Sequence, residues 1–125
     1  MTMSKILLLA LLLSLVGCST PIAYYKNTTP QLKLEEFYNG KLTAYGIVQS
    51  RNGKVLRRFS VDMTGTWNGN KGVLDEHFVY DDGEKQQRIW YLEKKSDGLY
   101  TGSASDVVKA ADGETQGYAL EWKYT

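Results

Sequence analysis

Paired turn residues recur along this chain at nearly equal intervals. Five Asn-Gly or Asp-Gly pairs place successive glycines 14 to 16 residues apart. The pairs are Asn52-Gly53, Asn68-Gly69, Asp82-Gly83, Asp97-Gly98 and Asp112-Gly113. Both dipeptides supply the positive φ angles that tight hairpin turns need. The spacing therefore predicts arms of similar length, each running antiparallel beside the last.

The arms between these turns alternate apolar with polar side chains. In the second arm, the odd-numbered positions (one parity) include Val55, Phe59, Val61, Met63 and Trp67. The even-numbered positions (the other parity) include Arg58, Ser60, Asp62, Thr64 and Thr66. This period of two predicts strands with one buried and one solvated face. Residues 89–92 are apolar on both parities, which predicts a strand that is covered on both faces.

These patterns predict an all-β fold, an antiparallel up-and-down meander of about six strands. Gly65, Gly102 and Gly117 fall inside arms, where glycine marks bends that let a sheet curl. Curling favours a lipocalin-like barrel, because closure removes exposed strand edges. The last arm still alternates at Tyr124-Thr125, so we expect the barrel to be incomplete.

The N-terminus carries a targeting signal. Ile6 to Val16 is an apolar run of eleven residues behind Lys5. It is shorter than the ~20 residues that span a bilayer and is typical of the helix of a secretory signal peptide. Leu15-Val16-Gly17-Cys18 resembles the bacterial lipobox, which implies cleavage before Cys18 and acylation of Cys18. Ser19 resembles the residue found in lipoproteins of the outer membrane.

The chain is therefore expected to have three segments. Residues 1–17 are the lipoprotein signal peptide, residues 18–40 are a lipidated tether and lead-in, and residues 41–125 are the antiparallel β domain. The tether assignment rests on its two prolines, which favour extended and semi-rigid backbone. We expect the N-terminal lipid to hold the protein on the periplasmic face of the outer membrane.

Composition excludes several function classes. The formal net charge is +1, which predicts no binding of nucleic acid. One cysteine rules out an internal disulfide, and one histidine rules out a site with two histidine ligands. No catalytic triad pattern, phosphate loop or dinucleotide fingerprint occurs. We therefore predict no enzyme activity, no cofactor, no metal and no catalytic residue.

Five residues are candidates for binding a ligand. Arg57 interrupts an apolar parity and Arg88 lies beside Trp90 in sequence; an inward arginine can pair with a carboxylate or phosphate. Trp67, Trp90 and Trp122 are candidates to line an apolar cavity. Two plainer interpretations stay open: an arginine near a strand end that reaches solvent, and aromatic side chains that form ordinary core.

One further cluster, residues 75–77, combines two carboxylates with the single histidine. A carboxylate and an imidazole can bind a divalent ion or transfer protons. Asp75 and His77 share one strand parity, however, and Glu76 lies on the other. This cluster is the weakest of the candidates.

Several short blocks resemble a known family. They include Phe37-Tyr38-Asn39-Gly40, Leu42-Thr43-Ala44-Tyr45-Gly46, Leu74-Asp75-Glu76-His77-Phe78, residues 100–108 and residues 119–124. Together, and in this order, they resemble the bacterial lipoprotein family labelled domain of unknown function 3833. The resemblance implies envelope localisation and fold, but no activity. Lys109 stands where members tend to have glycine, and members continue past Trp122 with further β-structure, which implies a C-terminally shortened chain.

Two functions fit these expectations. The first is a lipid-anchored module, resembling a β-barrel, that binds a lipid or another hydrophobic envelope molecule. The second is a structural or assembly lipoprotein that acts through contacts with envelope proteins at the outer membrane. The first is favoured by the aromatic, glycine-bent meander, and the second by the lack of catalytic motifs.

The lipid anchor is directly testable. Cys18→Ala removes the only thiol that can carry the lipid, and with balanced side-chain charges after residue 17 no polybasic patch remains to hold the membrane. We expect the variant to leave the membrane fraction, as measured by fractionation after a high-salt wash. Retention of the variant in washed membranes would contradict the lipoprotein assignment.

Overall fold

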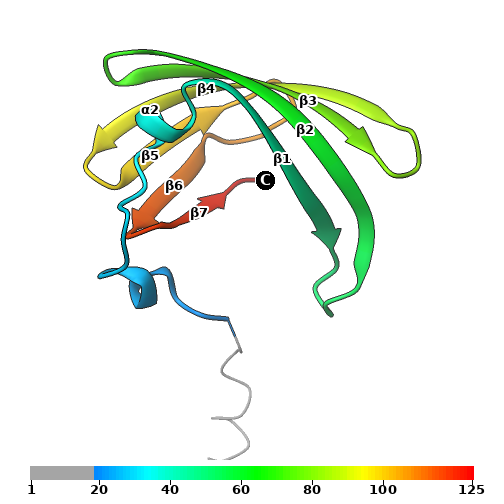
Figure 1. Cartoon of the computed structure of the whole chain (residues 1–125), viewed down its shortest axis with the longest axis horizontal. Helices are drawn as coiled ribbons and strands as arrows, with labels where there is room; N and C mark the ends of the chain where they lie inside the picture. Colours follow the sequence, from blue (N-terminus) through cyan, green and yellow to red (C-terminus); the bar gives the residue numbers. More distant parts are fainter. Residues whose placement is uncertain (1–18) are drawn as a thin grey trace, which may run out of the picture.

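The structure, a computed structural model, describes residues 19–125, so the expected signal peptide and Cys18 lie outside the described residues. One sheet dominates it. Its strands are β1 (Gly40–Gln49), β2 (Val55–Asn68), β3 (Lys71–Tyr80), β4 (Lys85–Ser96), β5 (Leu99–Ser103), β6 (Ala111–Gln116) and β7 (Ala119–Lys123). They follow a 3-10 helix, η1 (Ile22–Tyr25), and a short helix, α2 (Leu34–Phe37) (Figure 1). In this part of the chain no helix is long and apolar enough to cross a membrane.

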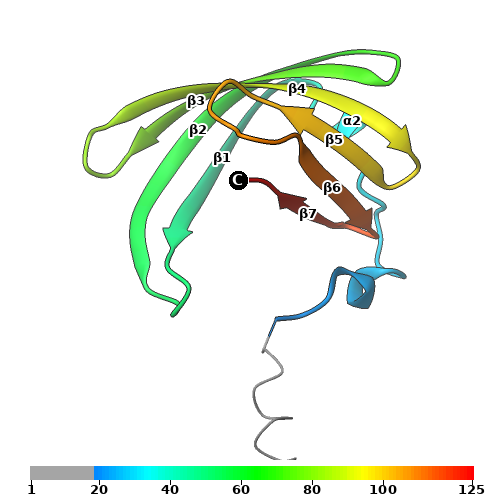
Figure 2. The same ribbon diagram turned by 180° about the vertical axis from the view of Figure 1, so that it is seen from behind.

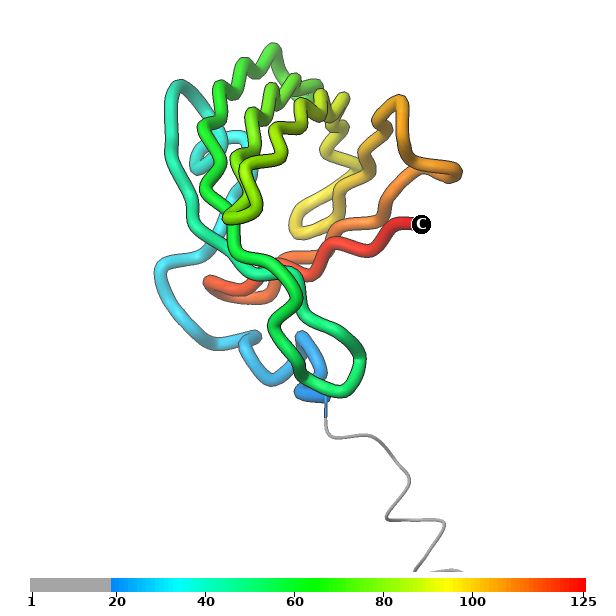
Figure 3. The backbone as a smooth tube through the Cα atoms, turned by 90° about the vertical axis from the view of Figure 1, so that its right-hand side faces the viewer, coloured from blue at the N-terminus to red at the C-terminus, as the bar shows by residue number. Residues whose placement is uncertain are grey.

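The sheet is an up-and-down meander. Its strands pair antiparallel in the order β1-β2-β3-β4-β5-β6-β7, which confirms the predicted fold class with seven strands in place of about six. The long strands β1 to β4 form an arch, and β6 and β7 fold back beneath it (Figures 1 and 2). Within residues 19–125, β1 and β7 remain the two edges of the sheet, so the fold is a half-barrel (Figure 3).

Four of the five predicted hairpin turns are confirmed. Gly53, Gly69, Gly83 and Gly98 each have a positive φ and each lie between two consecutive strands. The fifth prediction is wrong, because Asp112-Gly113 lies within β6. The turn between β6 and β7 instead uses Gly117, at a φ of 55°, and this residue was expected inside an arm.

The physical reason for the error at Gly113 is a close packing contact. A Cβ atom at this position would overlap the indole ring of Trp122. The glycine is thus required by the approach of a large side chain and not by a positive φ.

The predicted alternation of strand faces is confirmed in β2, where Val61 and Met63 are buried and Asp62 and Thr64 are exposed. Buried side chains of this parity form the core, together with inward residues of the other strands. The core consists of Val61, Met63, Leu74, Trp90, Leu92 and Ala111. The expectation that residues 89–92 are covered on both faces is wrong, because Tyr91 on the convex face is 59% exposed.

The segment before the sheet is packed against it. The Leu32 N–H donates to the Gly117 carbonyl at 2.8 Å, and the Tyr118 N–H donates to the Thr28 hydroxyl at 3.0 Å. Tyr25 and Tyr118 also place their ring centroids 5.8 Å apart. The described part of the expected tether is therefore docked on the β6–β7 hairpin.

A polar network fixes α2 to the sheet. The Tyr100 hydroxyl donates to Glu35 at 2.7 Å and accepts the Leu34 N–H at 3.3 Å. Lys94 donates to the other oxygen of Glu35 at 2.8 Å. These bonds hold α2 over one end of the half-barrel (Figure 1), and its first residue, Leu34, is 2% exposed.

Tyr100→Phe tests this network. The change removes the hydroxyl and leaves the Leu34 N–H without its partner, which typically costs about 1–3 kcal/mol. We expect the free energy of unfolding to fall by this amount in urea titrations. Tyr91→Phe, which removes an exposed hydroxyl from the convex face, is the control and should have almost no effect. Equal effects in the two variants would contradict the role of the network.

Candidate functional site

The concave face of the sheet borders an open hollow of ≈ 280 Å³. Its lining comes from the α2 region and from β1, β2, β3, β4 and β7. The lining residues are Leu34, Tyr38, Ala44, Phe59, Val61, Met63, Leu74, Glu76, Phe78, Trp90, Leu92, Leu120 and Trp122. Almost all are apolar, because one parity of each strand faces inward.

Two tryptophans meet inside this hollow. Trp122 on β7 and Trp90 on β4 form an edge-to-face pair, with ring centroids 5.4 Å apart and an interplanar angle of 89°. The Trp122 ring lies over Gly102 and Gly113, whose missing side chains leave the room that it occupies. Since β4 and β7 are separated by two strands in the sheet, this pair joins the arch to the strands folded beneath it.

Glu76 is the one carboxyl group in the lining. It lies in β3, opposite Met63 of β2 and Arg88 of β4. Its Oε1 atom is buried and has no hydrogen-bond partner among the described residues. Burial raises the pKa of Glu76 to about 7, although the Arg88 charge and the Trp90 side chain act in the opposite direction.

Arg88 lies beside this carboxyl but is engaged elsewhere. Its Nη2 atom is 2.8 Å from Asp106, and its Nη1 atom donates to the Tyr124 hydroxyl at 3.2 Å. The guanidinium also lies 5.6 Å from the centroid of the Trp90 ring. The hydrogen bond to Asp106 raises the pKa of Arg88 further. The Arg88 charge is thus balanced by Asp106, and within residues 19–125 no cation forms an ion pair with the Glu76 carboxylate.

The structure separates the other two sequence candidates from the hollow. Arg57 packs over the Tyr80 ring at 3.5 Å and pairs with Asp82 and Glu84 at 3.1 and 3.0 Å, at the tip of the β3–β4 hairpin. Trp67 donates from its indole nitrogen to the Tyr38 carbonyl at 3.1 Å. Neither side chain belongs to the lining.

The five candidates therefore divide into groups. Trp90 and Trp122 line the hollow, and Arg88 lies next to Trp90. Glu76 and Tyr38 also line the hollow, although neither was among these five ligand-binding candidates and Glu76 was considered only as part of the cluster at residues 75–77. A signal for Glu76 was present, because it shares its parity with Leu74 and Phe78, both apolar.

The cluster at residues 75–77 does not form a common site. Asp75 and His77 lie 3.2 Å apart, with the histidine and the carboxylate both partly exposed. Glu76 points to the opposite face of the same strand. Among residues 19–125, no group of three potential metal ligands comes together.

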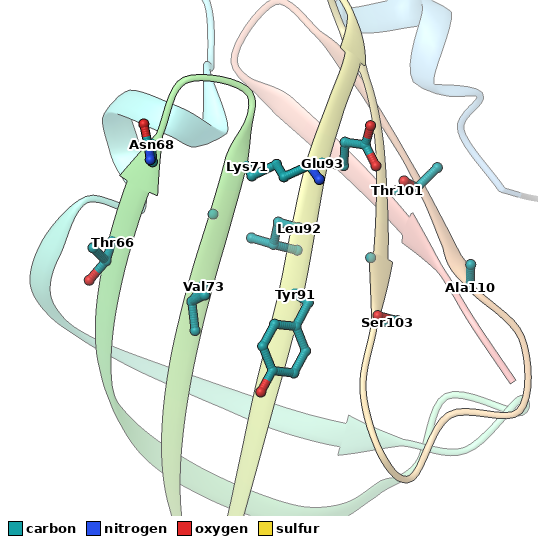
Figure 4. Close-up of a pocket in the computed structure, with 12 residues that line it drawn as sticks. Thr66, Asn68, Lys71, Val73, Tyr91, Leu92, Glu93, Thr101, Ser103 and Ala110 are labelled. Atoms are coloured by element: carbon teal, nitrogen blue, oxygen red, sulfur yellow. The ribbon is translucent and has the colours of Figure 1, made fainter.

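A second hollow, of ≈ 540 Å³, lies on the convex side of β2 to β5. Its surface combines Val73 and Tyr91 with hydroxyl groups and with Lys71 and Glu93 (Figure 4). Val73 is 40% exposed and Tyr91 is 59% exposed. Hydroxyl, amide and charged side chains make up much of its lining, whereas the lining of the concave hollow is almost wholly apolar, so this groove suits an apolar ligand less well.

The fold and the hollow define a class of protein, a single-sheet antiparallel half-barrel with an apolar interior. A family model with the description "Protein of unknown function (DUF3833)" matches residues 12–125. The chain belongs to this family, as its short sequence blocks indicated. Comparisons with the curated proteins and with the solved structures found no match.

The raised pKa of Glu76 predicts a pH-dependent stability. Between the ordinary value of 4.5 and about 7, the folded chain holds a proton that the unfolded chain has released. This contribution is complete below pH 4.5 and is lost as the pH rises through 7, with a slope of at most ~1.4 kcal/mol per pH unit. We expect Glu76→Gln to remove this slope in urea titrations between pH 5.5 and 8.

Glu93→Gln provides the matched control, because it makes the same chemical change on the convex face of the neighbouring strand. Its free energy of unfolding should follow the wild-type dependence on pH. Parallel curves for wild type and Glu76→Gln would show that Glu76 is not buried in the folded chain.

Proposed function

We propose that this protein is a lipid-anchored envelope protein, without enzyme activity, that binds a lipid or another hydrophobic molecule in the concave hollow of its half-barrel. The observation that carries the proposal is the apolar lining, which reaches from Leu34 at one end to Trp122 on the last strand. Such a surface gains about 0.8 kcal/mol for each methylene group that it removes from water. Ligand pockets usually measure roughly 300–1,000 Å³, so a volume of ≈ 280 Å³ favours one hydrocarbon chain over a larger body.

The position of the first helix supports a membrane source for this molecule. η1 begins at Ile22 and packs against β6 and β7. Ile22 lies four positions after Cys18, and an extended chain covers at most ~3.6 Å per position, or about 14 Å in total. If Cys18 carries the lipid, the half-barrel is held close to the membrane surface, where hydrophobic molecules are abundant.

The two open edges of the sheet favour a second function. β1 and β7 each have one neighbour only within the described residues, and an edge strand offers backbone groups that another chain can pair with. Tyr45 and Ile47 on β1 are 83% and 52% exposed. The alternative is thus an assembly protein that accepts a strand from an envelope partner.

Native mass spectrometry of the gently purified protein separates the two functions. Ala44 lines the hollow from β1, and Thr43 faces outward beside it. Ala44→Phe fills the hollow, whereas Thr43→Phe adds the same ring to the convex face. We expect a co-purifying hydrophobic molecule on wild type and on Thr43→Phe, and its loss from Ala44→Phe.

Thermal melting must show that both variants remain folded. A hydrophobic molecule that stays bound to a folded Ala44→Phe variant would contradict binding in the hollow. If a protein partner co-purifies in place of a small molecule, and both variants keep it, the result would favour the assembly function.

A further inference from the structure

The inside of the half-barrel contains a carboxyl oxygen that no described residue satisfies with a hydrogen bond. Glu76 lies among Met63, Leu74 and Phe78, all of which line the same hollow. Its Oε1 atom is shielded from solvent and receives no donor from the described residues. Leaving a buried acceptor of this kind without a donor destabilises the folded state, and more so if the acceptor is charged. A residue that only filled the core would be apolar.

The surrounding charges show which kind of group the carboxyl is suited to meet. From β4, Arg88 faces Glu76 but is held by Asp106 at 2.8 Å. From the segment after α2, Tyr38 lines the same hollow, and its pKa is raised by burial and by the Glu76 charge. Arg88 and Asp106 cancel, so ionised Glu76 leaves an excess of one negative charge at this end of the hollow.

We infer that the molecule bound in the hollow is an amphiphile whose head group donates hydrogen bonds and carries no negative charge, and that Glu76 receives this head group. The inference rests on the proposed function and names its ligand class. An amine or a hydroxyl on a hydrocarbon chain satisfies Oε1, and the chain covers the apolar lining. A carboxylate or phosphate at the same place would face a second negative charge in a medium of low dielectric constant.

Three probes with the same ten-carbon chain test this preference with the purified protein. Decylamine carries a cationic head, decanol a neutral hydroxyl, and decanoate an anion at pH 8, where Glu76 is above its raised pKa of about 7. Trp90 and Trp122 line the hollow, so tryptophan fluorescence reports binding. We expect wild type to bind decylamine and decanol at least ~10-fold more tightly than decanoate, as one charge-assisted hydrogen bond allows.

Two variants assign the preference to Glu76. Glu76→Gln keeps the shape of the side chain and removes its charge, so the three probes should bind within about threefold of one another. Glu93→Gln, with its change on the convex face, should keep the wild-type order. If Glu76→Gln fails to fold, Glu76→Met supplies an apolar replacement of similar length, for which decanol should lose its advantage over decanoate.

Each outcome has a distinct meaning. If none of the probes binds wild type, the proposed function fails. If all three bind wild type equally well, or if decanoate binds most tightly, the hollow is a binding site but the assignment of Glu76 is wrong. The assignment is also wrong if Glu76→Gln keeps the wild-type order of affinities.

Discussion

The contact between Trp122 and Trp90 determines the shape of this protein. Without it, seven strands in sequential order would form an open twisted sheet with two separate ends. The Trp122 ring fills the space over Gly102 and Gly113, and its edge-to-face contact with Trp90 ties the last strand to the middle of the sheet. The sheet is thereby curled on one side, and the curl gives the concave face its open hollow.

The other features of the site depend on this curl. The burial of Glu76, and with it the raised pKa, requires that β7 and the segment after α2 cover the inner face of β3. The Glu35–Tyr100–Lys94 network adds the cover at the α2 end. The interior is thus assembled from residues that are distant in sequence, and the carboxyl oxygen of Glu76 that the described residues leave unsatisfied lies where these elements meet.

Local patterns predicted most of the sheet. The alternation in β2 assigned Val61 and Met63 to the inner face, and four Asn-Gly or Asp-Gly turns were placed correctly. Local chemistry could not distinguish Gly113, which makes room for an indole ring, from Gly117, which turns the chain. Tyr91 was expected to be covered, because periodicity does not reveal which face of a sheet has a neighbour.

The candidate site was predicted less well than the fold. Trp90 and Trp122 line the hollow, but Arg57 is held on a hairpin tip by Asp82 and Glu84, a partnership set by how the strands pair. Glu76 was grouped with its sequence neighbours Asp75 and His77, although alternation along the strand places its side chain on the same face as Leu74. A single polar residue indicates a buried polar group only when all the side chains on its face of the strand are considered together.

We propose that the concave hollow, and not the convex groove, holds the hydrocarbon chain. Intermolecular nuclear Overhauser effects between decanol and the protein test it most directly. Binding in the hollow predicts cross-peaks from the alkyl chain to Trp90, Trp122 and Met63, which line it. Cross-peaks confined to Val73 and Tyr91, which line the convex groove, would contradict it.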